Sequence, residues 1–321
     1  MMSEITELKF TVRFSDCDEY GRLKLSRLFQ FMEEAAIADA ERGGFGLWRM
    51  IKAGYTSAIT RMKVRINHTP VMGEELHVST WIKEIYKDKV VLKDYAVIDS
   101  QGHALAEGTS SWILVNLKTG FAEPPSNSPY PFPIQLEKSA MPEMLSVLPM
   151  GEDPQLVYTE RARNSDLDLN HHVNHCRYVE WILDCLSKEE IKERGIRSLQ
   201  LNFVNQVPLG ANVNIIRFKD TNHHAVFFGM NADRSPASVH WHHSWQRDTL
   251  PSAGCRSSAC RYWRRSAPPD TLPASSRSLP GRRCLLLYAS LQTAGSADPC
   301  MPERPPCLHR TAVWQHRAAA E

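Results

Sequence analysis

Apolar residues recur at helical spacing in two segments of the chain. In each segment the apolar positions are three or four residues apart, and the first run stops at the pair Gly43 and Gly44. These positions are Leu28, Phe29, Met32, Ala35 and Ala36 in the first segment and Tyr178, Trp181, Ile182 and Cys185 in the second. Each segment therefore predicts one helix that buries a single face.

Strand-like patterns follow both predicted helices. Residues 62–78, MKVRINHTPVMGEELHV, and residues 199–215, LQLNFVNQVPLGANVNI, each indicate a strand, a turn with proline and glycine, and a second strand. Further strands are predicted at 89–98 and 104–116 in the first copy and at 224–232 in the second. Each half thus predicts one helix wrapped by a curved antiparallel sheet, which is an α+β fold.

The loop that precedes each helix is also repeated. Residues 13–23 read RFSDCDEYGRL and residues 163–173 read RNSDLDLNHHV, an offset of 150 residues. The strand blocks align at an offset of 137, because the first copy has a longer connection between its helix and its next strand. Two similar blocks in the same order favour tandem duplication over coincidence.

The two loops diverge after their second aspartate. The first copy places Tyr20 and Arg22 there, whereas the second places Asn170 and His172 after Asp168. An extended segment points alternate residues to one face, so we expect Asp168, Asn170 and His172 to converge just before the helix. Carboxylate, amide and imidazole groups beside a helix N-terminus suit a reaction that develops an oxyanion.

A simpler interpretation of this loop stays open. Aspartate and asparagine are common turn formers, Ser165 and Asn174 can cap a helix, and the histidines can be surface residues. A metal site at His171, His172 and His175 is disfavoured, because adjacent histidines of an extended chain point to opposite faces.

Composition and charge divide the chain near residue 245. The whole chain has 321 residues and a net charge of +2. Residues 1–245 carry 27 lysines and arginines against 31 acidic residues, whereas the rest carries 11 arginines, no lysine, 5 acidic residues and 9 of the 20 prolines. Since such a tail buries little apolar surface, we expect it to be disordered or to come from a shifted reading frame.

The predicted organisation has four parts. They are an N-terminal domain at 1–118, a proline-rich connector at 119–155, a C-terminal domain at 156–245 and the atypical tail at 246–321. The C-terminal domain ends early in this scheme, because no strand equivalent to 104–116 follows residue 232. A sheet truncated in this way would expose an unpaired edge.

Several classes of protein are excluded. The small net charge argues against a dedicated nucleic-acid binder, and no run of about 18 apolar residues predicts a membrane span. The N-terminal residues lack the pattern of a secretion signal. Only three of the eight cysteines, Cys17, Cys176 and Cys185, precede residue 250, so we expect a cytoplasmic protein without disulfides. The tail cysteines are spaced too widely for a close zinc-binding pair, and we expect no metal.

The second loop and helix, SDLDLNHHVNHCRYVEWILD, resemble the motif of acyl-acyl-carrier-protein (acyl-ACP) thioesterases. The stretches VRFSDCDEYGRLKLSRLFQFMEEAA and SAITRMKVRI are similar to the N-terminal half of that family. The resemblance covers residues 8–235. It implies two tandem hotdog folds, each a long helix wrapped by an antiparallel sheet, with the acyl chain held by the first and the catalytic residues in the second. It also implies hydrolysis of a fatty acyl thioester in fatty acid biosynthesis, without a cofactor or metal.

The resemblance carries catalytic roles to Asp168, Asn170 and His172. The family also uses an acidic residue on the strand after the helix, and Gln206 occupies that place here. Glutamine can hold a water molecule through its amide but cannot accept a proton. We therefore expect His172, whose ordinary pKa lies near neutrality, to act as the base and Gln206 to position the water.

The partner implied by the resemblance is the acyl carrier protein. Because that protein is acidic, a basic surface should receive it, and Lys83, Lys87, Lys89 and Lys93 surround one predicted turn. The same lysines can equally be an ordinary solvated surface. An acyl-CoA thioesterase and a non-catalytic acyl-binding or carrier-binding protein remain as alternatives, and a monomer or a homodimer fits the duplication.

Overall fold

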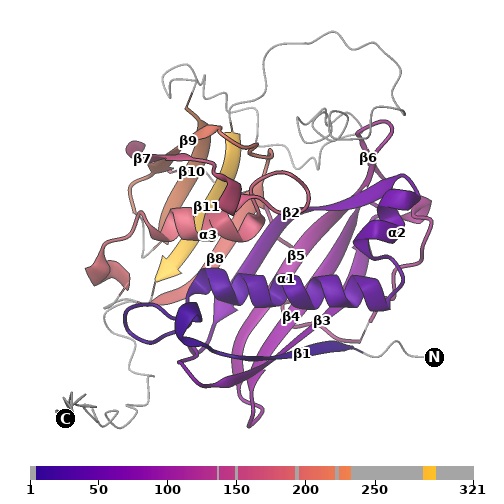
Figure 1. The fold of residues 1–321 in the computed structure, drawn as a ribbon, viewed down its shortest axis with the longest axis horizontal. Helices are drawn as coiled ribbons and strands as arrows, with labels where there is room; N and C mark the ends of the chain where they lie inside the picture. Colours follow the sequence, from indigo (N-terminus) through magenta and orange to yellow (C-terminus); the bar gives the residue numbers. More distant parts are fainter. Residues whose placement is uncertain are drawn as a thin grey trace, which may run out of the picture.

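The computed structural model describes residues 5–135, 137–148, 151–191, 195–220, 224–232 and 285–293. Their strands form one antiparallel sheet, and the two long helices lie on the same side of it (Figure 1). The helices are α1 (Leu25–Arg42), α2 (Leu47–Lys52) and α3 (His175–Leu183). The strands of the first half are β1 (Thr6–Thr11), β2 (Tyr55–Ile66), β3 (Glu75–Tyr86), β4 (Val90–Asp99), β5 (Ala104–Asn116) and β6 (Ala122–Glu123). Those of the second half are β7 (Gln155–Arg161), β8 (Ile196–Phe203), β9 (Asn212–Arg217), β10 (His224–Asn231) and β11 (Leu285–Thr293).

The order of the strands shows the duplication directly. From one edge the sheet runs β1-β3-β4-β5-β2, and from the other edge it runs β7-β9-β10-β11-β8. Each half is therefore one helix on a sheet of the same order, which is the predicted double hotdog. The halves join where β2 pairs with β8.

The pairing of β2 with β8 places a pseudo-twofold axis at the centre of the molecule. Lys63 lies opposite Gln200, its own equivalent at the offset of 137 residues. On either side, Met62 faces Leu201, the equivalent of Val64, and Val64 faces Leu199, the equivalent of Met62, as a twofold axis requires. This pairing makes the sheet continuous across the junction, and the apolar members of the pairs are buried.

Equivalent backbone hydrogen bonds hold the loop of each copy. The Leu23 N–H donates to the Pro70 carbonyl oxygen at 2.7 Å, and the Val173 N–H donates to the Val207 carbonyl oxygen at 2.9 Å. In both copies this bond fastens the loop before the helix to the turn after the central strand. The two donors are separated by the loop offset of 150 residues, and the two acceptors are separated by the strand offset of 137 residues. The same contact is therefore present in both copies.

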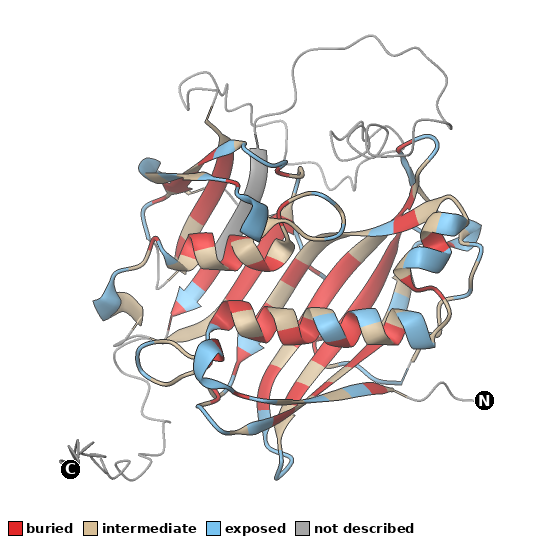
Figure 2. Ribbon diagram, viewed as in Figure 1, coloured by how far each residue is buried: buried red, intermediate tan, exposed pale blue. Residues whose placement is uncertain are grey.

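The predicted apolar faces are buried against the sheet (Figure 2). Helix α1 ends at Arg42, before the predicted glycine pair, and Gly44 takes a positive φ of 78° there. Helix α3 begins after Asn174, whose side chain accepts the Cys176 N–H at 2.8 Å, so the predicted cap forms. Apolar residues of both helices and both halves of the sheet form one continuous core.

The assignment of the whole tail outside the fold requires a correction. Leu285–Thr293 forms strand β11, which pairs with β10 on one side and β8 on the other. It takes the place that β5 occupies in the first half, so it is the strand that the sequence pattern did not supply after residue 232. The apolar run Leu285–Tyr288 lies in this strand, and Leu291 is fully buried. The remainder of the tail, 246–284 and 294–321, lies outside the described residues.

After β6 and a 3₁₀ helix at Pro125–Asn127, the proline-rich connector runs across the sheet from β3 to β8, where the Gln200 side-chain amide donates to the Ser146 carbonyl oxygen at 3.0 Å. The Trp81 indole N–H donates to the Lys138 carbonyl oxygen at 2.9 Å, and the carboxylate of Asp94 accepts the N–H groups of Ala140 and Met141.

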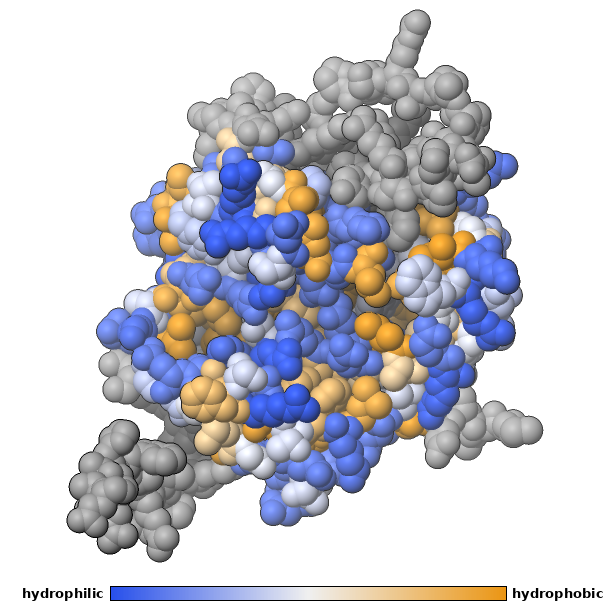
Figure 3. All heavy atoms as spheres, in the orientation of Figure 1, coloured by the Kyte–Doolittle hydropathy of each residue, from blue (hydrophilic) through white to orange (hydrophobic). Residues whose placement is uncertain are grey.

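Hydrophilic side chains cover much of the face seen in Figure 3, and apolar side chains appear there in separate patches. Even α1, the longest helix among the described residues, lacks the uninterrupted apolar stretch that a bilayer-spanning helix requires.

Candidate active site

The segment from Asp168 to His172 forms a tight turn. Asp168 and His172 are joined through the Asp168 N–H and the His172 carbonyl oxygen at 3.1 Å, and the Asn170 N–H donates to Oδ1 of Asp168 at 2.7 Å. His171 has a positive φ of 60°. The expected alternation of an extended chain is therefore wrong. Asp168 and His172 lie together because they face each other across a turn.

The first copy contains the same turn with different chemistry. The Asp18 N–H donates to the Arg22 carbonyl oxygen at 2.8 Å, and the side chains of these two residues form a salt bridge at 3.0 Å. In the second copy, Oδ1 of Asp168 lies 3.3 Å from Nδ1 of His172. The duplication thus keeps the carboxylate and replaces a permanent cation by a group that can lose and accept a proton.

The pair of Asp168 and His172 is half-buried. Burial raises the pKa of Asp168, but the contact with His172, its charge and the hydrogen bonds of Asn170 outweigh that effect and hold the pKa below its ordinary value. Among the described residues, Nδ1 of His172 finds no well-aligned hydrogen-bond partner, so its contact with Asp168 is mainly electrostatic. Since Nδ1 faces the carboxylate, Nε2 is the nitrogen that remains for chemistry.

Gln206 lies beside this turn. Its neighbour Val207 accepts the Val173 N–H at 2.9 Å, which brings the loop after β8 next to the end of the turn. Oε1 of Gln206 is buried and accepts no hydrogen bond from the described residues. A buried acceptor without a partner calls for an explanation, and a bound water or substrate group would provide one.

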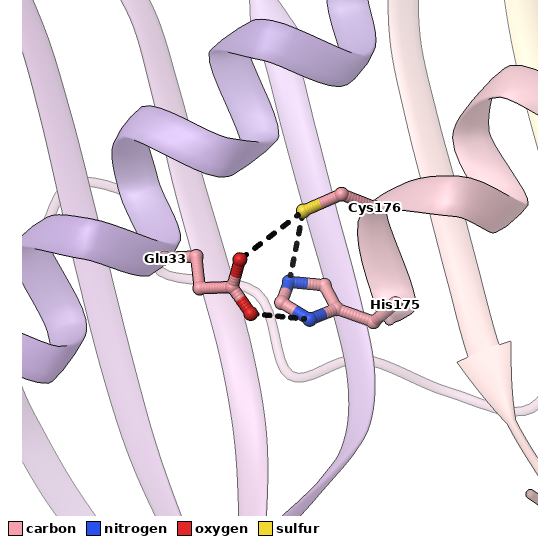
Figure 4. Close-up of side chains that lie close together, drawn as sticks. All are labelled: Glu33, His175 and Cys176. Atoms are coloured by element: carbon pink, nitrogen blue, oxygen red, sulfur yellow. Dashed lines mark hydrogen bonds and ion pairs between the residues drawn. The ribbon is translucent and has the colours of Figure 1, made fainter. Parts of the chain in front are cut away.

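A second polar cluster lies at the start of α3, and the sequence did not reveal it (Figure 4). Glu33 reaches across from α1, and its Oε1 accepts the Asn174 side-chain amide at 2.8 Å and lies 3.4 Å from Nδ1 of His175. Its Oε2 lies 3.8 Å from Sγ of Cys176. Burial lowers the pKa of His175, although the charges of Glu33 and Asp168 oppose that shift. The only local signal was an acidic residue next to Met32 on the apolar side of α1.

The predicted basic surface is wrong for two of its four lysines. Nζ of Lys93 lies 2.6 Å from Oδ2 of Asp39, and Nζ of Lys83 lies 2.9 Å from Oδ1 of Asp94. Both ammonium groups are buried or nearly so, because Lys93 faces α1 and Lys83 lies under the connector. Only Lys87 and Lys89 are exposed, so the four lysines do not form one surface for a partner.

Two hotdog folds side by side, with one polar turn that has exchanged arginine for histidine, define a double-hotdog protein with one candidate hydrolytic site. Family models agree with this fold. Residues 3–123 match the acyl-ACP thioesterase N-terminal domain, and residues 153–247 match the acyl-ACP thioesterase C-terminal domain. The chain belongs to the acyl-ACP thioesterase family.

Individual relatives are distant in sequence. The chain is 24% identical over 216 residues to an acyl-[acyl-carrier-protein] hydrolase of Cuphea viscosissima, a match that covers 60% of this chain and 50% of the relative. It is 24% identical over 208 residues to a palmitoyl-acyl carrier protein thioesterase of Arabidopsis thaliana, with the same coverage of 60% and 50%. The chain thus spans about half the length of these curated relatives.

Solved structures share the fold. An acyl-ACP thioesterase from Bacteroides thetaiotaomicron superposes with a TM-score of 0.69 at 19% identity, covering 90% of this chain and 97% of that one. The 12:0-ACP thioesterase from Umbellularia californica gives a TM-score of 0.61 at 16% identity, covering 90% and 96%. Both matches extend over the two hotdogs.

Proposed function

We propose that this protein hydrolyses the thioester between a fatty acyl chain and acyl carrier protein and thereby releases a free fatty acid. The observation that supports it most is the replacement of Arg22 by His172 in a turn whose aspartate and backbone hydrogen bonds are repeated. The first copy holds its aspartate with a group that cannot act as a base, whereas the second holds it with one that can. Family membership supports the same substrate class.

In the proposed reaction a water molecule attacks the thioester carbon. Nε2 of His172 takes a proton from this water, while Asp168 holds Nδ1 and stabilises the imidazolium that forms. Asn170 donates to the thioester carbonyl or to the nearby pantetheine arm. The carbon–sulfur bond then breaks, and His172 returns the proton to the departing thiolate.

Gln206 has a separate role in this proposal. No described residue donates a hydrogen bond to its buried Oε1, so this oxygen accepts a hydrogen bond from the attacking water and fixes the direction of attack. It cannot take that proton. The resemblance to a family with an acid at this place makes Gln206 the position where the division of roles can be tested.

The proposal also includes the acyl chain, the cell compartment and the assembly. The first hotdog holds the acyl chain along α1, and the protein acts in the cytoplasm as a monomer or a homodimer. The free thiols of Cys17, Cys176 and Cys185 support a reducing compartment.

The test is the release of free fatty acid from acyl-ACP and from acyl-CoA by the full chain. We expect hydrolysis of acyl-ACP, and we expect His172→Ala to lower its rate by about 10²–10⁴-fold, the usual contribution of a general base. His171→Asn is the matched control, because it removes the neighbouring imidazole and asparagine tolerates a positive φ.

Four outcomes would change the proposal. An unchanged rate in His172→Ala refutes the role of His172. A gain of about 100-fold or more in Gln206→Glu assigns the base to residue 206 instead. Turnover of acyl-CoA alone makes the protein an acyl-CoA thioesterase, and binding of acyl-ACP without turnover makes it a binding protein.

A further inference from the structure

The cluster of Glu33, His175 and Cys176 combines three kinds of metal-binding atom in one place. It is separate from the proposed base, since none of its members belongs to the turn from Asp168 to His172. A carboxylate oxygen, an imidazole nitrogen and a sulfur, one from each residue, all lie within 4.8 Å of one another. Figure 4 shows the three side chains pointing toward one another, Glu33 from α1 and the other two from α3.

The contacts within the cluster of Glu33, His175 and Cys176 leave one acceptor without a proton. Nδ1 of His175 lies 3.4 Å from the carboxylate oxygen Oε1 of Glu33, whose negative charge favours the proton of the neutral ring on Nδ1 and leaves Nε2 its lone pair. That Nε2 lies 3.6 Å from Sγ of Cys176, and Oε2 of Glu33 lies 3.8 Å from the same sulfur. The thiol has one proton and two acceptors facing it, so it satisfies only one of them.

A metal ion would satisfy all three atoms at once. Around a tetrahedral zinc ion, sulfur at about 2.3 Å and nitrogen or oxygen at about 2.0–2.2 Å lie roughly 3.3–3.7 Å from one another. The distances of 3.6 Å and 3.8 Å from Sγ to Nε2 and Oε2 are close to that spacing. The thiolate, the carboxylate and a neutral imidazole would also balance the two charges of the ion, which favours a partly buried site.

The surroundings prepare these ligands. The Asn174 amide donates to Oε1 of Glu33 at 2.8 Å, which orients the carboxylate and leaves Oε2 for an ion. Cys176 is fully buried, whereas the side chains of Glu33 and His175 are 23% and 12% exposed, so an ion can reach the cluster from the side of Glu33. Sulfur and nitrogen ligands favour zinc over magnesium or calcium, which prefer oxygen.

We propose that Glu33, His175 and Cys176 form a zinc site that joins the first hotdog to the second. Oε2 of Glu33, Nε2 of His175 and Sγ of Cys176 are the ligands, and a water molecule completes the tetrahedron. Binding converts the Cys176 thiol to a thiolate and releases its proton to the solvent. No change of oxidation state is involved.

The test uses the full chain, with its tag removed and its thiols kept reduced by a phosphine. Zinc is titrated against a coloured chelator, and cobalt(II) is titrated as a spectroscopic substitute. We expect binding of one ion per chain that depends on Cys176, release of about one proton, and a thiolate-to-cobalt band in the near ultraviolet.

Matched variants separate this site from the other seven cysteines of the chain. Cys176→Ser and Glu33→Gln should each weaken the binding by about 10–100-fold or more, and Cys176→Ser should abolish the cobalt band. Cys185→Ser, which changes a buried free thiol near the other end of α3, should leave both unchanged. Zinc should raise the Tm of the wild type but not that of Cys176→Ser, so a loss of stability in a variant is seen separately from a loss of binding.

Two results would overturn the zinc site. One is the same zinc affinity and cobalt spectrum in the wild type and in Cys176→Ser. The other is a dependence on Cys176 that neither Glu33→Gln nor His175→Gln alters, because the ion would then be held elsewhere. Both measurements are made without substrate, so their outcome is independent of thioester hydrolysis.

Discussion

His171 takes the backbone conformation that Gly21 takes in the first copy of the repeated turn. The φ angles are 60° and 72°, and each residue donates its N–H to the carbonyl oxygen of the aspartate three positions earlier. Glycine adopts this conformation without strain, whereas a residue with a Cβ atom loses about 1–2 kcal/mol. The second copy thus holds its candidate catalytic residues in a turn under backbone strain.

The effect of replacing His171 on the free energy of unfolding should therefore depend on how easily the new residue adopts a positive φ. We expect His171→Gly to leave the free energy of unfolding unchanged or to raise it by up to about 1 kcal/mol, and His171→Val to lower it by about 1–2 kcal/mol. Urea denaturation of both variants measures the difference. Equal stabilities for glycine and valine would show that this φ angle does not constrain the turn.

Asp168 should make stability depend on pH in acid. Its pKa is held below the ordinary value, although burial acts the other way, because the contact with His172, its charge and the hydrogen bonds of Asn170 favour the carboxylate. In the unfolded chain the pKa of an aspartate is near 3.9. Because the pKa is lower in the folded protein, the ionised carboxylate stabilises the fold at pH values above 3.9, and this contribution is lost as the pH falls through the pKa of the folded state.

The difference in unfolding free energy between the wild type and Asp168→Asn should therefore be largest near neutral pH and should shrink below about pH 4. Denaturation at a series of pH values measures it. Glu34→Gln, on the exposed side of α1, is the control and should show no such trend. A difference that stays constant from pH 3 to pH 7 would contradict the assignment.

Removing one charge of the buried pair Lys93 and Asp39 should lower the free energy of unfolding much more than replacing both residues by apolar ones. Nζ of Lys93 lies 2.6 Å from Oδ2 of Asp39, and Thr6 donates to Oδ1 of the same carboxylate at 2.8 Å. Burial lowers the pKa of Lys93, and Asp39 opposes that shift. Asp39→Asn leaves an uncompensated buried charge, so we expect a loss of about 3–5 kcal/mol in unfolding free energy.

The double variant Asp39→Leu with Lys93→Met provides the control for this pair. Since apolar residues can replace a buried ion pair with little loss, we expect it to recover most of the stability that Asp39→Asn loses. Chemical denaturation of the three proteins measures the comparison. A double variant that is as unstable as Asp39→Asn would mean that the packing, and not the charge, determines the cost.

Strand β11 should contribute to the core. Leu291 is fully buried, whereas its neighbour Gln292 is exposed. We expect Leu291→Ala to lower the free energy of unfolding by about 2–5 kcal/mol and Gln292→Ala to change it by no more than about 0.5 kcal/mol. Truncation before Leu285 should expose the edges of β8 and β10 and cause aggregation, as measured by light scattering. Equal stability of the two point variants would place this strand outside the fold.

The periodic elements were accessible from the sequence because their signals are local. The spacing of Phe29, Met32 and Ala36 predicted α1, and the offsets of 150 and 137 residues predicted the duplication. Asp168 and His172 were also found correctly as neighbours, although for the wrong geometric reason. An extended chain and a tight turn both bring residues four apart to one side, and only the hydrogen bonds of the backbone distinguish them.

Contacts between distant segments were not accessible. Glu33 and Asn174 are 141 residues apart and meet because α1 and α3 lie side by side on one sheet. Lys93 and Lys89 looked alike in the sequence, yet one is buried against Asp39 and the other is exposed at a turn. Which face of a strand is covered depends on the element packed on it, and no local pattern specifies that element.

The sequence by itself determined that this protein is two copies of one helix-and-sheet unit and that the second copy carries the candidate chemistry, since periodicity and repetition are properties of the chain. Tertiary structure alone decided that Leu285–Thr293 completes the second sheet, that Asp168 and His172 pair across a strained turn, and that Glu33 reaches His175 and Cys176. The pairing of β11 and the contact of Glu33 arise from sheet register and helix packing, which join segments far apart in the chain, and backbone hydrogen bonds close the turn, so all three exist only in the folded molecule.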